Sequence, residues 1–268
     1  MTRNYAKTHP IFGYFIFAFG ISWLGILTIF AANKFDLSPL LPLEGGLLFL
    51  AMVLGPSVSG VFFTTLLEGP SGLKKLVERA LRWRVALRWY AVVLLTIPII
   101  LTIILLVLAR FVDPAFAPRF QWPLFAIGLV AASFEEIGWT GFTTPQLLKR
   151  KNFAIAGLFL GILWAFWHLL VDFRYNFGAI KGLWPLEFTI AYLATLTLYR
   201  ILMTWVYSHT QSLLLAILMH ASYTGWLLIL VPIVTSTQTL IWSSALALTL
   251  WAVVVVVLLY SSARNRRG

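Results

Sequence analysis

Apolar residues dominate this chain in long runs that short polar stretches separate. The runs are about 20 residues long, the length that an α-helix needs to cross the hydrocarbon core of a bilayer. The alternating ten-residue segments typical of membrane β-barrels do not occur. The pattern predicts an all-α polytopic membrane protein with about eight transmembrane helices, folded as a single membrane domain over residues 1–268. The predicted spans are approximately Ile11–Ala31, Gly46–Leu67, Trp89–Ala109, Pro123–Leu147, Phe153–Val171, Pro185–Val206, Ser212–Val231 and Thr239–Tyr260.

One polar stretch, Ser71–Arg88, has a helical periodicity of its own. Apolar residues recur there at roughly helical spacing among six lysines and arginines. A basic helix with an apolar face typically lies in the membrane interface. We therefore expect one interfacial amphipathic helix, which anchors on anionic headgroups. Docking of a substrate is the alternative interpretation of the same pattern.

The placement of the charges predicts how the chain is oriented. Its net charge is +11, but the basic residues lie between the apolar runs and at the termini, which argues against nucleic acid as a partner. Fifteen of the 20 lysines and arginines, Arg200 included, fall on the side of both termini. The positive-inside rule then predicts cytoplasmic N- and C-termini. The chain has no cysteine, which excludes thiol chemistry.

Two adjacent carboxylates interrupt the fourth predicted span, at Glu135 and Glu136. An ionised carboxylate at the centre of a membrane helix costs about 2.5–3.5 kcal/mol on insertion scales. Such a residue by default indicates a functional site that faces the bundle interior, together with polar partners.

Two histidines within spans, His168 and His220, are the candidate partners of these carboxylates. At 1.5 Å per residue, Glu135, His168 and His220 lie roughly 20, 25 and 14 Å from the cytoplasmic ends of their helices. These depths overlap, so a water-containing cavity ringed by the fourth, fifth and seventh spans is expected. A carboxylate beside imidazoles can activate water as a general base or complete a metal site. The alternative is that each histidine is a satisfied polar residue that bridges helices.

These residues also carry a resemblance to a known family. The sequence contains Glu135-Glu136 followed by Gly138-Trp139-x-Gly141-Phe142, then Trp164-x-x-x-His168, then His220-Ala-Ser-Tyr-Thr224. In this order, and after a basic amphipathic helix, the motifs resemble those of the CPBP family. That family comprises type II CAAX prenyl endopeptidases and Abi proteins, which act in bacteriocin processing or self-immunity. The family-like core is expected at about residues 120–232.

The resemblance implies a role for each motif residue. Glu135 would activate the attacking water, His168 would assist, His220 would polarise the scissile carbonyl, and Glu136 would orient the site. Three supporting positions depart from the family pattern: Thr140 replaces Arg, Trp164 replaces Phe, and Thr224 replaces Asn. Because Thr140 brings no positive charge, Glu136 is expected to lack a cationic partner and to favour protonation. The shorter Thr224 is expected to weaken oxyanion stabilisation.

The resemblance implies an integral protein of a bacterial or archaeal cell membrane, with the bilayer and a membrane-associated peptide or protein substrate as partners. Its cofactor stays open. His168, His220 and Glu135 could hold zinc, or a glutamate-activated water could act without metal. Asp172, one turn beyond His168 and at the start of a predicted polar loop, could orient that imidazole. Two other functions remain: a non-catalytic immunity or interaction protein of the same fold, and a proton-coupled transporter.

Overall fold

The computed structural model describes residues 8–35, 41–176 and 183–265, and these residues form helices and no strand. Arg3, Lys7, Lys181, Arg266 and Arg267, which enter the orientation prediction, lie outside the described residues. The elements are α2 (Pro10–Ala32), α3 (Pro42–Ala80), α4 (Leu87–Phe111), η1 (Pro114–Phe116), η2 (Trp122–Leu124), α5 (Phe125–Gly138), η3 (Trp139–Thr143), α6 (Thr144–Leu148), α7 (Phe153–Trp167), α8 (Leu169–Asn176), α9 (Trp184–Glu187), η5 (Phe188–Ala194), α10 (Thr195–Thr210), α11 (Leu213–Leu230) and α12 (Ser236–Asn265).

The prediction of an all-α polytopic membrane protein is confirmed. Seven helices among the described residues are long and apolar enough to cross a membrane, and they correspond to seven of the eight predicted spans. The remaining span, which carries the glutamates, consists of α5, η3 and α6 in direct succession. Here η3 is a π-helical turn, in which backbone hydrogen bonds reach five residues back instead of four.

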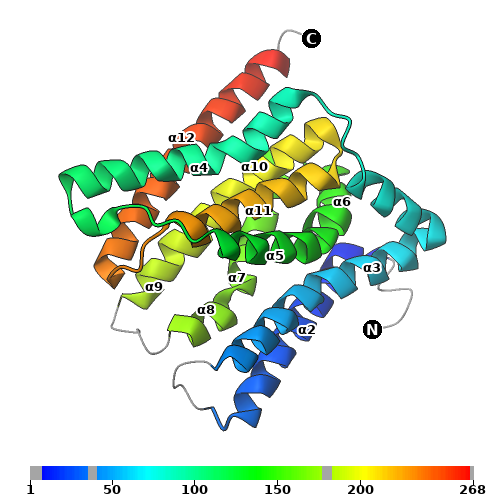
Figure 1. Ribbon diagram of the computed structural model, residues 1–268. Coiled ribbons are helices and arrows are strands. Elements are labelled where there is room, and N and C mark those ends of the chain that lie inside the picture. Colours follow the sequence, from blue (N-terminus) through cyan, green and yellow to red (C-terminus); the bar gives the residue numbers. More distant parts are fainter. Residues whose placement is uncertain (1–7, 36–40, 177–182, 266–268) are drawn as a thin grey trace.

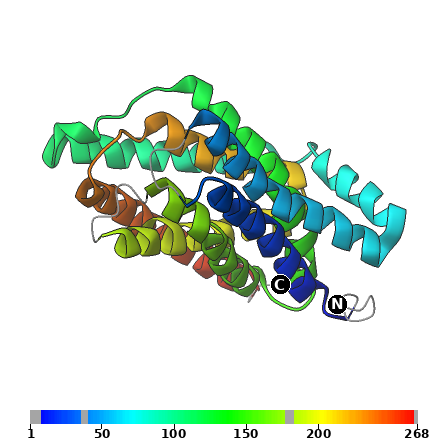
Figure 2. The same cartoon turned by 90° about the horizontal axis from the view of Figure 1, so that it is seen from below.

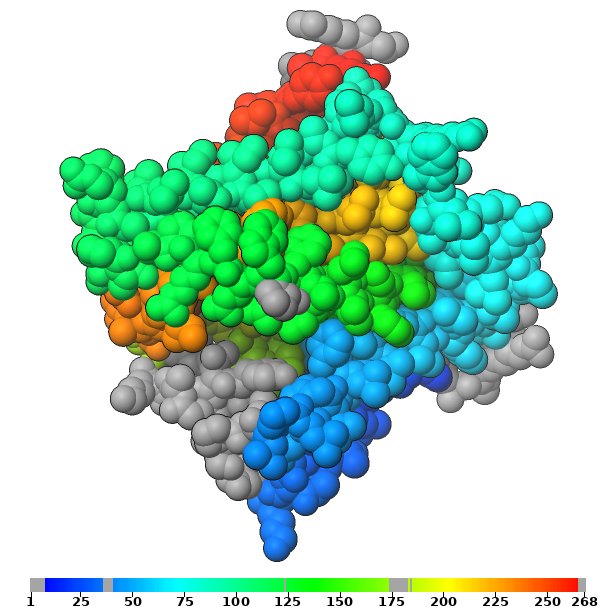
Figure 3. All heavy atoms as spheres, in the orientation of Figure 1, coloured from blue at the N-terminus to red at the C-terminus, as the bar shows by residue number. Residues whose placement is uncertain are grey.

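The helices lie in two packed rows (Figures 1 and 2). In the first row α2, α3, α5, α11 and α4 are neighbours in that order, and in the second row α7 packs on α10 and α10 on α12. Figure 3 shows the outer face of the first row, which α3, α4 and α5 largely cover. Large apolar side chains of α4, such as Ile99 and Ile103, are more than half exposed, as expected for a surface that contacts lipid.

Small residues let the helices that carry the glutamates and their neighbours approach closely. Gly138, at the end of α5, lies directly against the backbone of Pro56 in α3, and a Cβ atom at Gly60 would lie 2.8 Å from the Cα atom of Gly138. The Ser57 hydroxyl donates to the Phe134 carbonyl across the same contact at 2.7 Å. Glycine, serine and proline at this crossing therefore fix the position of α5 relative to α3.

The amphipathic segment is shorter than the sequence predicts. Helix α3 bends at Gly69, whose φ of 61° suits glycine, and the basic segment that follows stays helical to Ala80. The prediction that it continues to Arg88 is wrong, because neighbouring side chains take up the carbonyls beyond Ala80. The Ser212 hydroxyl donates to the Arg82 carbonyl at 2.7 Å, and the Tyr90 hydroxyl donates to the Trp83 carbonyl at 2.6 Å.

The predicted polar loop also begins later than expected. Asp172 does not start a loop but lies within α8, and its side chain is buried. The fifth span therefore continues through Asp172, which places this carboxylate inside the helical bundle.

Candidate functional site

Glu136, on α5, is the centre of a buried polar cluster between the two rows of helices. Arg200 of α10 donates from Nη1 to Oε2 and from Nη2 to Oε1, each at 2.9 Å. Nδ1 of His220, on α11, lies 2.8 Å from Oε1, and the Thr140 hydroxyl donates to Oε2. Neither Glu136 nor Arg200 has any exposed surface. A carboxylate with this many charge-assisted partners is fixed in position.

Arg200 corrects two expectations. It was counted among the cytoplasmic topology signals, but it is fully buried in a bidentate ion pair. Glu136 was expected to lack a cation because Thr140 stands where the family has arginine, but α10 supplies the guanidinium from another helix. The sequence spacing pointed to the fourth residue along the same helix, whereas the partner is close only in space. Thr140 still adds a neutral hydrogen bond.

Glu135 has different surroundings from its neighbour. Its Oε2 accepts hydrogen bonds from two indole N–H groups, of Trp164 at 2.9 Å and of Trp139 at 3.2 Å. Among the described residues we find no hydrogen bond to Oε1. The side chain is 5% exposed. Neutral donors hold one oxygen of this carboxylate and leave the other available as a base.

Trp164, on α7, connects the members of the cluster. Its N–H group binds Glu135, and the Arg200 guanidinium lies over its ring, 4.0 Å from the centroid. The rings of His220 and His168 stand edge-on to it, at centroid distances of 5.0 and 5.7 Å. Trp164 stands where the family pattern has phenylalanine. The tryptophan adds a hydrogen bond to Glu135 through its indole N–H group. Its ring also makes a cation–π contact with Arg200, the partner of Glu136.

His168 lies at the C-terminal end of α7, at the edge of the cluster. Its Nδ1 is 2.9 Å from the carbonyl oxygen of Trp164, so Nδ1 carries the proton in the neutral ring and Nε2 remains an acceptor. The ring contacts Trp167 and Tyr192 at centroid distances of 4.8 and 5.5 Å. His168 is close enough to Glu135 and His220 for electrostatic interaction.

Asp172 reaches the cluster through Tyr192. The two side chains share a hydrogen bond, and the Tyr192 ring lies against His168. The carboxylate that the sequence placed behind His168 thus has a hydrogen bond to a tyrosine whose ring contacts this imidazole. Tyr192 was not singled out from the sequence, because nothing in its spacing connects it to the histidine.

Thr224 lies one turn beyond His220 on α11 and is only half-buried. Its backbone lies against Gly128 of α5. Within the described part of the chain, no hydrogen bond joins its hydroxyl to the glutamates or histidines. The structure thus brings together Glu135, Glu136, Thr140, Trp164, His168 and His220, and leaves Thr224 outside their hydrogen-bond network.

The donors do not fit the suggested metal site of His168, His220 and Glu135. No group of three His, Asp or Glu side chains arranged to hold a metal ion occurs in the part of the chain that the structure describes. The Nδ1 atom of His220 is directed at Glu136 and that of His168 at a backbone carbonyl, so only the Nε2 atoms of these histidines remain open to a further ligand. The indole groups occupy Oε2 of Glu135.

Two π-helical turns border this cluster. One, η3, contains Trp139 and Thr140, and the other, η5, contains Tyr192. In both, a threonine that follows the turn donates its hydroxyl to a carbonyl five residues back: Thr144 to Trp139 at 2.8 Å, and Thr195 to Ile190 at 2.6 Å. Such turns are rare in α-helices and frequent at functional sites.

Known proteins resemble the part of the chain that holds the cluster. Residues 117–226 match the family model described as "Type II CAAX prenyl endopeptidase Rce1-like". CAAX prenyl protease 2 of Methanococcus maripaludis is 28% identical over 103 residues, which cover 37% of this chain and 37% of that protein. The match thus spans little more than a third of the length of this relative. All residues of the cluster lie in the range that the family model matches.

Proposed function

We propose that this integral membrane protein, whose residues 117–226 match the Rce1-like model of type II CAAX prenyl endopeptidases, is an endopeptidase that hydrolyses peptide bonds with a glutamate-activated water. The observation that carries the proposal is the convergence of Glu135, Glu136, His168 and His220 around Trp164. A buried carboxylate with one available oxygen, next to two imidazoles, is a suitable arrangement for general-base hydrolysis.

Glu135 is the proposed base. Its Oε1 takes a proton from water while the hydroxide oxygen forms a bond to the carbonyl carbon of the substrate. The same carboxyl then returns the proton to the amide nitrogen as the carbon–nitrogen bond breaks. The two indole donors on Oε2 keep the carboxylate oriented throughout. His168, at the edge of the cluster, presents Nε2 to the same water as a second acceptor.

His220 is the proposed electrophile. Its Nδ1–H donates to the Glu136 carboxylate, so in the imidazolium form Nε2–H is free to donate to the developing oxyanion. The Arg200–Glu136 pair is neutral as a unit. Glu136 is thus a positioning residue, which holds the tautomer and orientation of His220 as carboxylates commonly do.

The proposed substrate is a membrane-associated peptide or protein. The name of the relative, CAAX prenyl protease 2, suggests prenylated proteins with a C-terminal CAAX sequence as the first class to examine. The proposed setting is a bacterial or archaeal cell membrane with both chain termini in the cytoplasm.

Substitution of Glu135 by Gln tests the mechanism. We expect the full-length protein in lipid vesicles to cleave a farnesylated CAAX peptide, and Glu135→Gln to lower the rate at least about 100-fold, because the base is lost. Glu44→Gln makes the same chemical change outside the cluster and is expected to keep the wild-type rate. Equal rates for wild type and Glu135→Gln would rule out this mechanism.

A non-catalytic immunity or interaction protein of the same fold is the second candidate. The observation in its favour is that Glu135 and Glu136 are at most 5% exposed, with Thr224 outside the network. This function requires that Glu135→Gln leaves immunity or partner binding intact and that the wild type cleaves no membrane peptide.

A further inference from the structure

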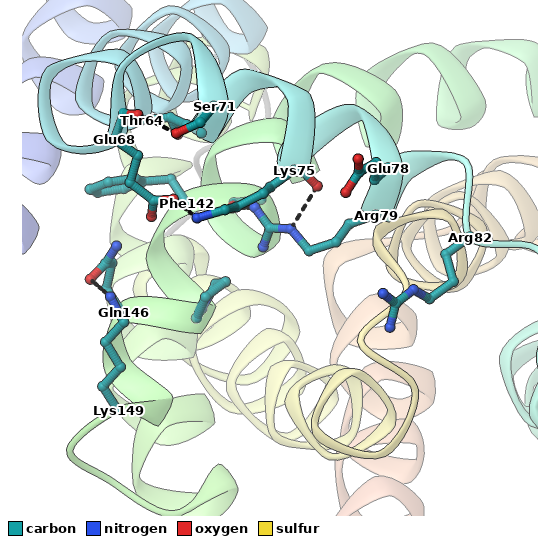
Figure 4. Close-up of a pocket in the computed structure, with 13 residues that line it drawn as sticks. Thr64, Glu68, Ser71, Lys75, Glu78, Arg79, Arg82, Phe142, Gln146 and Lys149 are labelled. Carbon is teal, nitrogen blue, oxygen red and sulfur yellow. Dashed lines mark hydrogen bonds and ion pairs between the residues drawn. The ribbon is translucent and has the colours of Figure 1, made fainter.

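A cavity lies beyond the glutamates along the same span, between the basic end of α3 and the η3–α6 segment. Its volume is about 710 Å³, and Figure 4 shows the side chains that surround it. Four of these are cationic: Lys75, Arg79, Arg82 and Lys149. Two are carboxylates, Glu68 and Glu78, so the wall carries an excess of positive charge.

The partners of these cations determine how much of the charge is available. Lys75 is paired with Glu68 at 3.0 Å. Arg79, however, donates to the Tyr207 hydroxyl and the Gly141 carbonyl, each at 2.8 Å, and Lys149 donates to the amide oxygen of Gln146 at 2.9 Å. These acceptors are neutral and leave the positive charge in place. In the described part of the chain, no carboxylate lies within ion-pair distance of Arg79, Arg82 or Lys149.

The position of the cavity indicates the kind of anion. The bend at Gly69 ends the membrane-crossing part of α3, and the segment behind it lies across the end of the bundle (Figures 1 and 2). Leu81 and Trp83, which flank Arg82, are 69% and 60% exposed. Cationic side chains next to exposed apolar ones match a phospholipid, in which a phosphate is joined to acyl chains.

We propose that this cavity binds the headgroup of one anionic phospholipid, with Arg82 and Lys149, which line opposite sides of the cavity in Figure 4, as its principal charged contacts. Arg79 forms the rear wall: its side chain is fixed by Tyr207 and Gly141, and it contributes charge. Leu81 and Trp83 lie along the acyl chains. This binding site is independent of the proposed hydrolysis, because none of its residues belongs to the glutamate cluster.

The test measures lipid binding by the full-length protein in detergent, through thermal stabilisation and native mass spectrometry. Phosphatidylglycerol is titrated against wild type, against Arg82→Gln/Lys149→Gln, and against Lys74→Gln/Arg150→Gln. The last variant removes the same charge from equally exposed neighbours that do not line the cavity. Phosphatidylcholine and inorganic phosphate are titrated in parallel.

We expect phosphatidylglycerol to bind the Arg82→Gln/Lys149→Gln variant about tenfold or more weakly than wild type, because charge-assisted hydrogen bonds are lost. The Lys74→Gln/Arg150→Gln variant should stay within about twofold, because its two charges lie outside the cavity and salt screens them from the bound headgroup. Equal weakening in both variants, or equal binding of phosphatidylcholine, would overturn the proposal. Saturation by inorganic phosphate, with no gain from the lipid, would assign the cavity to a soluble phosphate and overturn the lipid assignment.

Discussion

Glu135 and Glu136 are neighbours in sequence, but they belong to two chemically different halves of the cluster. The charged half consists of Glu136, Arg200 and His220, which are almost completely buried and joined by bonds of 2.8–2.9 Å. The indole half consists of Glu135, Trp139 and Trp164, in which neutral donors contact a single carboxylate oxygen. Adjacent residues on a helix point about 100° apart, which allows each carboxylate its own surroundings.

The difference separates a positioning role from a chemical one. Both oxygens of Glu136 are occupied by a guanidinium, an imidazole and a hydroxyl, so protonating it would disrupt several bonds at once. Glu135 keeps an oxygen that can accept a proton while its indole contacts stay in place. In the proposed mechanism Glu136 holds His220 in place, and Glu135 changes protonation state in each cycle.

The largest expected effect comes from removing one member of the buried ion pair. Arg200→Gln or Glu136→Gln should lower the free energy of unfolding by about 3–5 kcal/mol, because each leaves an unpaired buried charge. Glu135→Gln should change it by less than about 1.5 kcal/mol, because only neutral donors are affected. Denaturant-induced or thermal unfolding in detergent measures all three variants.

The double variant Arg200→Gln/Glu136→Gln completes a mutant cycle. If the two side chains act as a pair, the double variant is more stable than the sum of the single losses predicts. Additive losses, or a Glu135→Gln variant as unstable as Glu136→Gln, would remove the distinction between the two halves.

An intermediate effect is expected for Trp164→Phe, which keeps an aromatic ring and removes the N–H group that binds Glu135. The loss of a hydrogen bond to a charged acceptor predicts a cost of about 1.5–3 kcal/mol in the free energy of unfolding. The rate of peptide cleavage should fall as well, because Glu135 is then held by Trp139 alone.

Trp242→Phe is the matched control for this substitution. The Trp242 N–H group is buried and has no hydrogen-bond partner among the described residues, so the same change there removes no bond. A stability loss at Trp242 equal to that at Trp164 would show that ring size, and not the bond to Glu135, is responsible.

The smallest effect is expected for Thr140→Val, which removes the hydroxyl from Glu136 and preserves the side-chain shape. Because Arg200 continues to donate to the same oxygen, the cost should be about 1 kcal/mol, measured by unfolding in detergent. Thr204→Val, which removes only a bond to a carbonyl of its own helix, is the control. A loss above about 3 kcal/mol at Thr140 would mean that the hydroxyl, and not Arg200, is the main partner of Glu136.

Much of the helical architecture could be predicted from the sequence, because a membrane imposes a length and an apolar composition on each span. Glu135 and Glu136 stood out for the same reason, as carboxylates within an apolar run. Arg200 lies inside a predicted span and offered the same signal. It was interpreted as a topology marker because its partner is 64 residues away and no spacing rule connects them.

The details that depend on side-chain direction could not be predicted. The presence of Trp instead of Phe at residue 164 does not reveal in which direction the indole N–H group points. The end of the basic helix at Ala80 depends on hydroxyl groups of Ser212 and Tyr90, which reach it from elsewhere in the fold. Hydrophobic periodicity likewise gives no indication of the two π-helical turns, since each changes the helix by a single residue.

The π-helical turn at Trp139–Thr143 has a consequence for how the length of this chain can vary. Such a turn holds one residue more than an α-helix would place there, so deleting one residue would restore α-helical geometry and rotate everything beyond it by about 100°. Glu135 and Glu136 would keep their places on α5, while Gln146 and Lys149 would turn away from α3. Single-residue insertions and deletions in Trp139–Thr143 should therefore be far less tolerated than substitutions. The number of residues in this turn sets the rotation of α6 relative to α5, and thus the orientation of the cavity side chains relative to the glutamate cluster.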